Sequence, residues 1–235
     1  MTNDATYHNL HAVRVWDLPT RVFHWCLAVA VVGAFVTVKL GGLWMDWHVR
    51  FGLAAFALIL FRLIWGLVGP RYARFSTFLK GPSTVLAYLK GRYQHGLGHN
   101  PLGALSVVAM LLILGFQAAS GLFANDDILT SGPLAYLDDN LSRRLTELHK
   151  LNQWPMLIVV GLHILAILWY RLVRKQGLTA AMVRGNARVP SDRLAHAAPA
   201  RDTWQIRLGA LALALAVAAL TYWLTTLAPV MDFSF

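Results

Sequence analysis

Five apolar stretches approach or reach the length of about 20 residues that an α-helix needs to cross a bilayer. With 57% hydrophobic and 14% charged residues in 235 positions, the chain has the composition of a membrane protein rather than of a soluble domain. We therefore expect an all-α integral membrane protein in a lipid bilayer. The polar N-terminus lacks a signal-cleavage pattern, so the first span is expected to stay. The stretches cover residues 22–40, 48–68, 102–124, 148–170 and 206–228.

The segments between these stretches differ in charge. Residues 1–21, 69–100 and 171–207 together hold fifteen Lys and Arg, whereas the remaining loops and the tail are acidic. By the positive-inside rule, the basic segments face the cytoplasm of a bacterial inner membrane. This places the N-terminus in the cytoplasm and the C-terminus in the periplasm. The net charge of +10 then reflects topology, and a nucleic-acid partner is not expected.

The fourth stretch contains two histidines, His149 and His163, fourteen residues apart. Fourteen residues of helix rise ~21 Å and fall ~40° short of four full turns, so both rings share one face at different depths. Histidine is expensive in hydrocarbon and therefore usually functional, and its neutral nitrogen is a common metal ligand. The alternative is a pair of histidines that merely hydrogen-bond to neighbouring helices.

A second pair of histidines lies at matching depths. His24 is near the cytoplasmic end of the first span, and His48 opens the second span at the periplasmic face. Depth then pairs His24 with His163 and His48 with His149. One histidine from each of two helices is how a four-helix bundle holds a planar cofactor, which indicates two bis-imidazole b-type haems. Zinc would need more ligands at each depth.

The sequence excludes covalent haem attachment. The chain has one cysteine, Cys26, and no C-x-x-C-H motif, so any haem is held non-covalently.

Four features together resemble a known family, the bacterial cytochrome b561 group, which includes the b-type cytochrome subunits of nickel-iron hydrogenases. They are VWDLPTRVFHW, the histidine that opens the second span, GHNPLGAL, and the histidines fourteen apart in the fourth span. The resemblance implies a four-helix transmembrane bundle with two stacked b haems. It also implies electron transfer between a periplasmic partner and a membrane quinone. The axial ligands would be His24, His48, His149 and His163.

The resemblance covers residues 14–174, so we expect a di-haem four-helix domain over 1–174. A solvated cytoplasmic linker is expected over 175–205 and a fifth transmembrane helix over 206–228, outside the family core. That last helix has no histidine, and we interpret it as a packing or contact element.

Several polar residues are candidates for cofactor or quinone contacts. Arg21 and Arg62 are positioned to pair with propionates of the inner haem, although Arg62 would equally reach the headgroups. Arg143 or Arg144 would serve the outer haem. Asn100, beside His99, is positioned to hydrogen-bond a quinone carbonyl. The alternative is that Asn100 is the N-cap of the third span with Pro101 in its first turn, and the two roles are compatible.

These observations predict a protein that transfers electrons across the membrane through two bis-histidine haems. The periplasmic partner would be a c-type cytochrome or a redox enzyme subunit, drawn to the acidic loop 125–147. An alternative is a self-contained, quinone-linked oxidoreductase that acts on superoxide or another small periplasmic donor. A third class, an ion transporter with a histidine relay, predicts a colourless protein.

Overall fold

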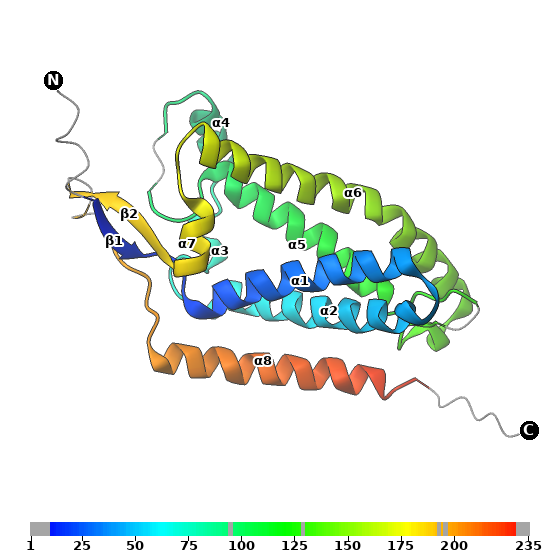
Figure 1. The fold of residues 1–235 in the computed structure, drawn as a ribbon. Helices are drawn as coiled ribbons and strands as arrows, with labels where there is room; N and C mark the ends of the chain where they lie inside the picture. The colour runs from blue at the N-terminus through cyan, green and yellow to red at the C-terminus, as the bar shows by residue number, and fades with distance from the viewer. Residues whose placement is uncertain (1–9, 94–95, 128–129, 192–193, 195–196, 229–235) are drawn as a thin grey trace, which may run out of the picture. The chain divides into compact units, whose positions relative to one another are not determined.

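The computed structural model describes residues 10–93, 96–127, 130–191, 194 and 197–228. Within these residues, five helices are long and apolar enough to cross a membrane. The prediction of an all-α integral membrane protein with five spans is confirmed. The helices are α1 (Leu18–Leu40), α2 (Met45–Val68), α5 (Pro101–Gly121), α6 (Asp139–Leu172) and α8 (Trp204–Thr225), shown in Figure 1.

The fourth span is longer than its apolar stretch. Helix α6 begins at Asp139, nine residues before the expected start at 148. Asp138 caps this start, because its carboxylate accepts the Leu141 N–H at 2.8 Å. The first turns are charged, so hydropathy alone registers only the later, apolar part of the helix.

Shorter elements connect the spans. They are the 3₁₀ turns η1 (Gly42–Trp44) and η2 (Ala135–Leu137), the helices α3 (Phe75–Phe78), α4 (Pro82–Leu89) and α7 (Leu178–Arg184), and the strands β1 (Leu10–Arg14) and β2 (Asn186–Pro190).

The chain separates into two compact units, and each is described by itself. The first unit comprises Met1–Val22, Ile64–Val108 and Gly161–Gly209. The second unit comprises Phe23–Leu63, Ala109–Val160 and Ala210–Phe235.

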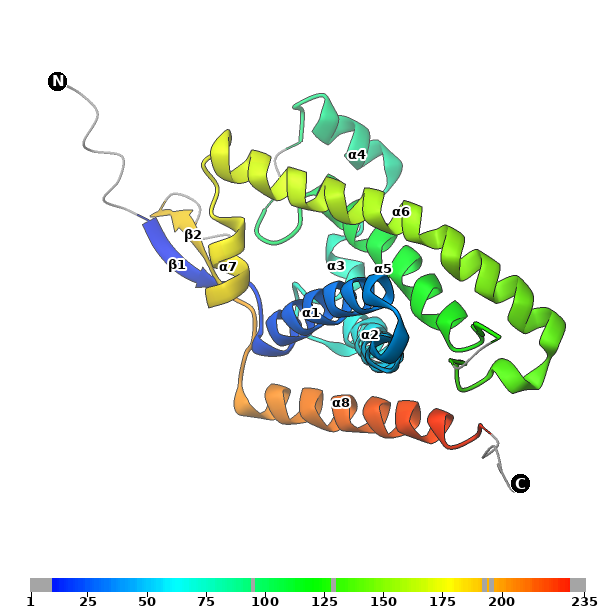
Figure 2. The ribbon, with the colours of Figure 1, turned by 45° about the vertical axis from the view of Figure 1, so that its right-hand side comes forward.

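In the first unit, β1 and β2 pair antiparallel, with Leu10 opposite Pro190 and Arg14 opposite Asn186. Helix α7 lies next to this sheet in both views (Figures 1 and 2). It ends at Gly185, which has φ 87° and whose carbonyl accepts the N–H groups of Val15 and Trp16 at 2.8 and 3.0 Å. A Cβ at this position would lie 2.8 Å from the Trp16 carbonyl oxygen. Glycine is therefore needed both for the left-handed conformation and for the close approach.

The expectation of a solvated linker over 175–205 does not describe this segment. It contains α7 and β2, and the side chains of Val189 and Ala200 are buried. The Ala200 N–H donates to the carbonyl of Arg14 at 2.8 Å. The sequence did not predict this fold because β2 pairs with residues about 175 positions earlier in the chain. The charged, Ala-rich sequence around β2 contains no pattern that indicates a strand.

The start of α1 is fixed by the buried residue Asp17, which is 1% exposed. Its carboxylate accepts the backbone N–H of Thr20 at 2.9 Å and the Thr20 hydroxyl at 2.8 Å. The indole N–H of Trp65 donates to the same carboxylate at 3.3 Å. A capping side chain followed closely by Pro19 is a typical helix start.

In the second unit, four helices share one core. Its fully buried residues come from α2, α5 and α6, and residues of α1 pack against it. Because lipid is as apolar as these side chains, close packing rather than exclusion from water stabilises such a core. The buried residues are Ile59, Leu114, Ala118 and Met156, with Leu27, Val31 and Phe35 of α1 against them.

Candidate functional site

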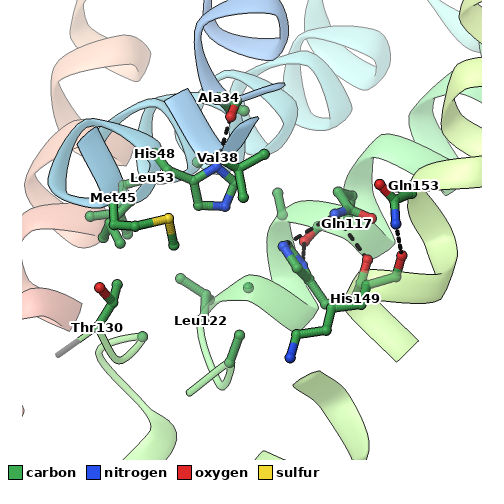
Figure 3. Close-up of a pocket in the computed structure, with 18 of the residues that line it drawn as sticks. Ala34, Val38, Met45, His48, Leu53, Gln117, Leu122, Thr130, His149 and Gln153 are labelled. Carbon is green, nitrogen blue, oxygen red and sulfur yellow. Dashed lines mark hydrogen bonds between the residues drawn. The ribbon is translucent and has the colours of Figure 1, made fainter. Parts of the chain in front are cut away.

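A cavity of about 330 Å³ lies in the second unit, where α1 ends and α2 begins. Residues of α1, α2, α5, α6 and the segment 124–133 line it. Its size falls in the range of ~300–1,000 Å³ that is usual for ligand sites. Most of the lining is apolar, and two histidines, His48 and His149, project from opposite sides (Figure 3).

His48 is the fourth residue of α2, and a carbonyl on a neighbouring helix orients it. Its Nδ1 lies 2.8 Å from the backbone oxygen of Ala34 in α1. A carbonyl oxygen can only accept, so Nδ1 carries the proton and donates. The other nitrogen, Nε2, is then left with its lone pair, as metal-ligating histidines require.

His149 is oriented in the same manner by α5. Its Nδ1 lies 2.9 Å from the backbone oxygen of Gln117, and the Ser120 hydroxyl lies 3.2 Å from the same nitrogen. Gly121 leaves room for the ring, because a Cβ there would lie 3.1 Å from Cε1 of His149. The proton of His149 is therefore also on Nδ1, and Nε2 is the nitrogen that keeps its lone pair.

The two rings are separated as two ligands of one metal would be. Their centroids are 6.1 Å apart and their planes are inclined by 82°. An imidazole nitrogen lies ~2 Å from a metal that it ligates, and the ring centroid lies ~1 Å further, so two imidazoles on opposite sides of one metal have centroids ~6 Å apart. The donor set, the ring separation and the apolar cavity fit a bis-histidine haem.

A polar network within the bundle supports His149. The side-chain amide of Gln117 donates to the His149 carbonyl at 3.2 Å and lies 3.2 Å from Nε2 of the same ring. Its oxygen accepts from Asn152 at 2.8 Å, and Asn152 also donates to the carbonyl of Ile113 at 3.1 Å. Ligation through Nε2 requires the Gln117 amide to give up one contact, and the other bonds keep it beside the ring.

The second predicted pair does not fall within one unit. His24, on α1, belongs to the second unit and makes an edge contact with Trp25 at 5.0 Å between ring centroids. His163, on α6, belongs to the first unit. Both side chains are half-buried. Their pairing stays a prediction from helix register.

The two predicted propionate partners have different surroundings. Arg62 is only 3% exposed, which places its guanidinium inside the protein rather than on a lipid-facing surface. Arg21 donates from Nη1 to the carbonyl of Val183 at 2.6 Å, so it holds the last turn of α7. Arg143 and Arg144 are not among the residues that line the cavity, whose basic side chains are Lys39 and Lys150.

Asn100 caps α5, as the structural alternative predicted. Its oxygen accepts the Gly103 N–H at 2.7 Å, and its amide nitrogen donates to the Tyr170 hydroxyl at 2.8 Å. The Tyr88 hydroxyl lies 3.1 Å from that of Tyr170. Burial, together with this hydrogen bond, raises the pKa of Tyr88 to about 12, so Tyr88 stays protonated at neutral pH.

His99, the neighbour of Asn100, is held between two aromatic rings. Its ring centroid lies 4.7 Å from that of Trp16 and 4.6 Å from that of Phe78. Both aromatic residues belong, like His99, to the first unit.

Sequence reasoning missed the groups that support the ligands. Gln117 and Asn152 are polar residues inside apolar spans, and this was a usable signal because such residues are rare in a bilayer. The Ala34 carbonyl could not be recognised from the sequence, because every residue has a backbone carbonyl.

Five helices that are long and apolar enough to cross a membrane define a multi-pass membrane protein, and two histidines face one cavity in its four-helix core. The model of the prokaryotic cytochrome b561 family matches residues 15–185, and the chain belongs to that family. It is thus a b-type cytochrome that takes part in electron transfer and uses haem b.

Two curated relatives match this chain over most of their own length. A probable Ni/Fe-hydrogenase B-type cytochrome subunit of Rhodobacter capsulatus is 24% identical over 239 residues, 83% of this chain and 90% of the relative. A protein of the same description from Azotobacter chroococcum mcd 1 is 25% identical, over 77% of this chain and 91% of the relative. No solved structure matches the chain.

Proposed function

We propose that this protein carries electrons across a bacterial inner membrane through two bis-histidine b haems, between a periplasmic redox partner and the quinone pool. The observation that carries the proposal is the His48–His149 pair, with ring centroids 6.1 Å apart and both Nδ1 atoms bound to backbone carbonyls. Haem supplies the one-electron redox chemistry when bound. The chain supplies the ligands, their orientation and a surrounding of low polarity.

The second haem is assigned to His24 and His163 from helix spacing. The separation of fourteen positions between His149 and His163 puts both imidazoles on one face of α6, ~21 Å apart in depth. Arg62 is assigned to a haem carboxylate because it follows His48 by fourteen residues and so lies on the same face of α2 near the inner haem. Its burial is compatible with that place. Arg21 is a weaker candidate, because its Nη1 is bonded to Val183.

The orientation follows from charge. Fifteen Lys and Arg in the segments 1–21, 69–100 and 171–207 support a cytoplasmic N-terminus. Five spans then put the C-terminus in the periplasm; residues 229–235 lie outside the described residues. The outer end of the bundle is the one with His48 and His149.

The partner is proposed from the relatives. Both are described as hydrogenase cytochrome subunits, which supports a membrane-associated redox enzyme as the electron donor or acceptor of this chain. A soluble c-type cytochrome with a basic face is the second candidate partner, because the segment 125–147, which includes the first turns of α6, is acidic.

The quinone is proposed to bind near His99 and Asn100. The Asn100 amide nitrogen already donates to Tyr170, so a quinone carbonyl would have to take over that hydrogen bond. The hydroxyls of Tyr88 and Tyr170, 3.1 Å apart, would supply further hydrogen bonds to the quinone at this place. Reduction of a quinone to a quinol takes two electrons and two protons.

The test uses the purified, full-length protein in liposomes that contain quinone. A membrane-impermeant reductant on the periplasmic side should reduce quinone with the parent protein and not with His149→Ala or His24→Ala. Quinone reduction that survives both substitutions would contradict the proposal. Rapid reduction by superoxide, without any protein partner, would favour the self-contained oxidoreductase instead.

A further inference from the structure

The lining of the cavity around His48 and His149 includes charged side chains. Among the described residues that line it, the charged side chains are Lys39, Lys150 and Asp126. The Asp126 carboxylate accepts the backbone N–H of Thr130 at 2.8 Å, within its own loop. The cavity therefore has one more positive than negative charge in an otherwise acidic stretch of the outer surface.

Lys39 is held at the cavity wall. Its ammonium group lies 3.3 Å from the side-chain oxygen of Gln153 and 5.3 Å from the centroid of the Phe35 ring. Both contacts orient a side chain that could otherwise extend into water or headgroups.

Gln153 links the two lysines, which come from different helices. Its oxygen accepts from the Lys39 ammonium of α1 at 3.3 Å. Its amide nitrogen donates to the backbone carbonyl of Lys150 in α6 at 2.8 Å; Figure 3 draws Gln153 beside His149. Lys150 directly follows the ligand His149, so one helix turn carries both a ligand and a cation. Two cations from two helices in the lining of an apolar cavity are suited to a flat, apolar ligand with two carboxylates at one edge.

We propose that Lys39 and Lys150 bind the two propionate carboxylates of the haem that His48 and His149 ligate. This inference rests on the proposed function, because it assumes a haem in this cavity. It replaces Arg143 and Arg144, which do not line the cavity. Each lysine then gives a charge-assisted hydrogen bond and neutralises one carboxylate in a place of low polarity.

The chain offers a matched control. Arg50 is a cation of α2 at the same end of the bundle, but it stacks on Trp47 at 5.0 Å and does not line the cavity. Removal of its charge should change the local field without touching a haem carboxylate.

The experiment compares Lys39→Met, Lys150→Met and Arg50→Met in the full-length protein, with haem labelled by ¹³C in its propionate carboxyl groups. Labelled 5-aminolevulinate (¹³C at its carboxyl carbon) introduces the label in cells that cannot make the precursor. We expect each lysine variant to shift labelled carboxylate bands in the redox-difference infrared spectrum. Each should also lower the midpoint potential of the haem lost in His149→Ala, because a nearby positive charge favours the reduced haem. Lys39→Arg and Lys150→Arg keep the charge and should restore the midpoint potential, whereas their different hydrogen-bond geometry should leave the carboxylate bands displaced from those of the parent.

Unchanged bands and potentials in both lysine variants would overturn the inference, as would equal shifts in Arg50→Met. If His48→Ala and His149→Ala themselves keep all haem, the proposed function fails and not merely the role of the lysines. If a lysine variant yields no folded protein, its charge-retaining arginine variant provides the comparison: bands displaced from those of the parent support carboxylate contact, and identical bands contradict it.

Discussion

Gln117 and His149 contact each other through both their backbones and their side chains. The Gln117 carbonyl oxygen lies 2.9 Å from Nδ1 of His149, and the Gln117 amide nitrogen lies 3.2 Å from the His149 carbonyl. The backbone contact fixes the tautomer, and the side-chain contact ties α5 to α6. The His149 ring is thus oriented by α5, which faces it, rather than by its own helix.

This arrangement predicts a measurable coupling between Gln117 and Asn152, whose side chains are 2.8 Å apart. Gln117→Leu should keep the haem, because the backbone carbonyl remains, but should destabilise the protein by ~1 kcal/mol. Thermal unfolding of Gln117→Leu, Asn152→Leu and the double variant should give a coupling energy of ~0.6–1.7 kcal/mol. Strictly additive effects would mean that the hydrogen bond contributes nothing.

Gly185→Ala is expected to loosen the sheet of the first unit. The residue has φ 87°, and an added Cβ would lie 2.8 Å from the Trp16 carbonyl oxygen. We expect the left-handed conformation alone to lower the free energy of local unfolding by ~1–2 kcal/mol. The measurement is the rate of tryptic cleavage after Arg184 or Arg188, which should rise. The control is Gly177→Ala, where φ is −83° and the new Cβ meets only Ala180 at 3.8 Å. Equal cleavage rates for both variants would contradict the role of Gly185.

The contact between the N-terminal strand and the start of α8 is expected to weaken in acid. Burial would raise the pKa of Asp202, but hydrogen bonds from Arg207 and the Leu18 N–H, and the charges of Arg207 and Arg14, lower it below 3.8 overall. A depressed pKa stabilises the fold above the unfolded value of 3.8, and this stabilisation is lost as the pH falls through the folded value.

Asp202→Asn should therefore reduce the protease resistance of strand β1 near pH 7, and the difference from the parent should shrink below pH 3.8. Asp127→Asn, in an exposed loop, serves as the control. A difference that stays constant from pH 7 to pH 3 would show that Asp202 does not act through its charge.

The acidic loop is expected to steer a basic partner. Asp126 lines the cavity of the His48–His149 pair, whereas Asp138 caps α6 through the Leu141 N–H. Asparagine also caps helices, so replacement of Asp126, Asp127, Asp138 and Asp139 by Asn should leave the fold intact. Stopped-flow reduction by a basic cytochrome should be slower in this variant at low salt, and the difference should vanish at high salt. Identical rates at low salt would place the docking surface elsewhere.

The sequence was sufficient to predict the spans and the approach of His48 to His149 in one cavity. Span length and apolar composition are local properties, and His48 and His149 could be matched because helices have a fixed rise per residue. The β1–β2 sheet and the folded segment around α7 were not predictable in this way. Their pairing depends on contacts between residues 10–14 and 186–190, which no local pattern records.

Side-chain roles at the cavity were the least predictable part. Arg143 and Arg144 were nearest in sequence to His149 among the arginines, yet the cavity is lined by Lys39 and Lys150. Which residues of α6 line the cavity depends on the face of the helix on which they lie. Arg143 and Arg144 are not on the face that lines the cavity.

The pairing of four histidines into two haem sites is tested most directly by the haem content and redox titration of the parent and its histidine variants. We expect two non-covalent b haems per chain, both removed by acid-acetone. His48→Ala and His149→Ala should each lose the same redox component, and His24→Ala and His163→Ala should each lose the other. A parent protein with one haem per chain, or His149→Ala and His163→Ala lacking the same component, would contradict this assignment.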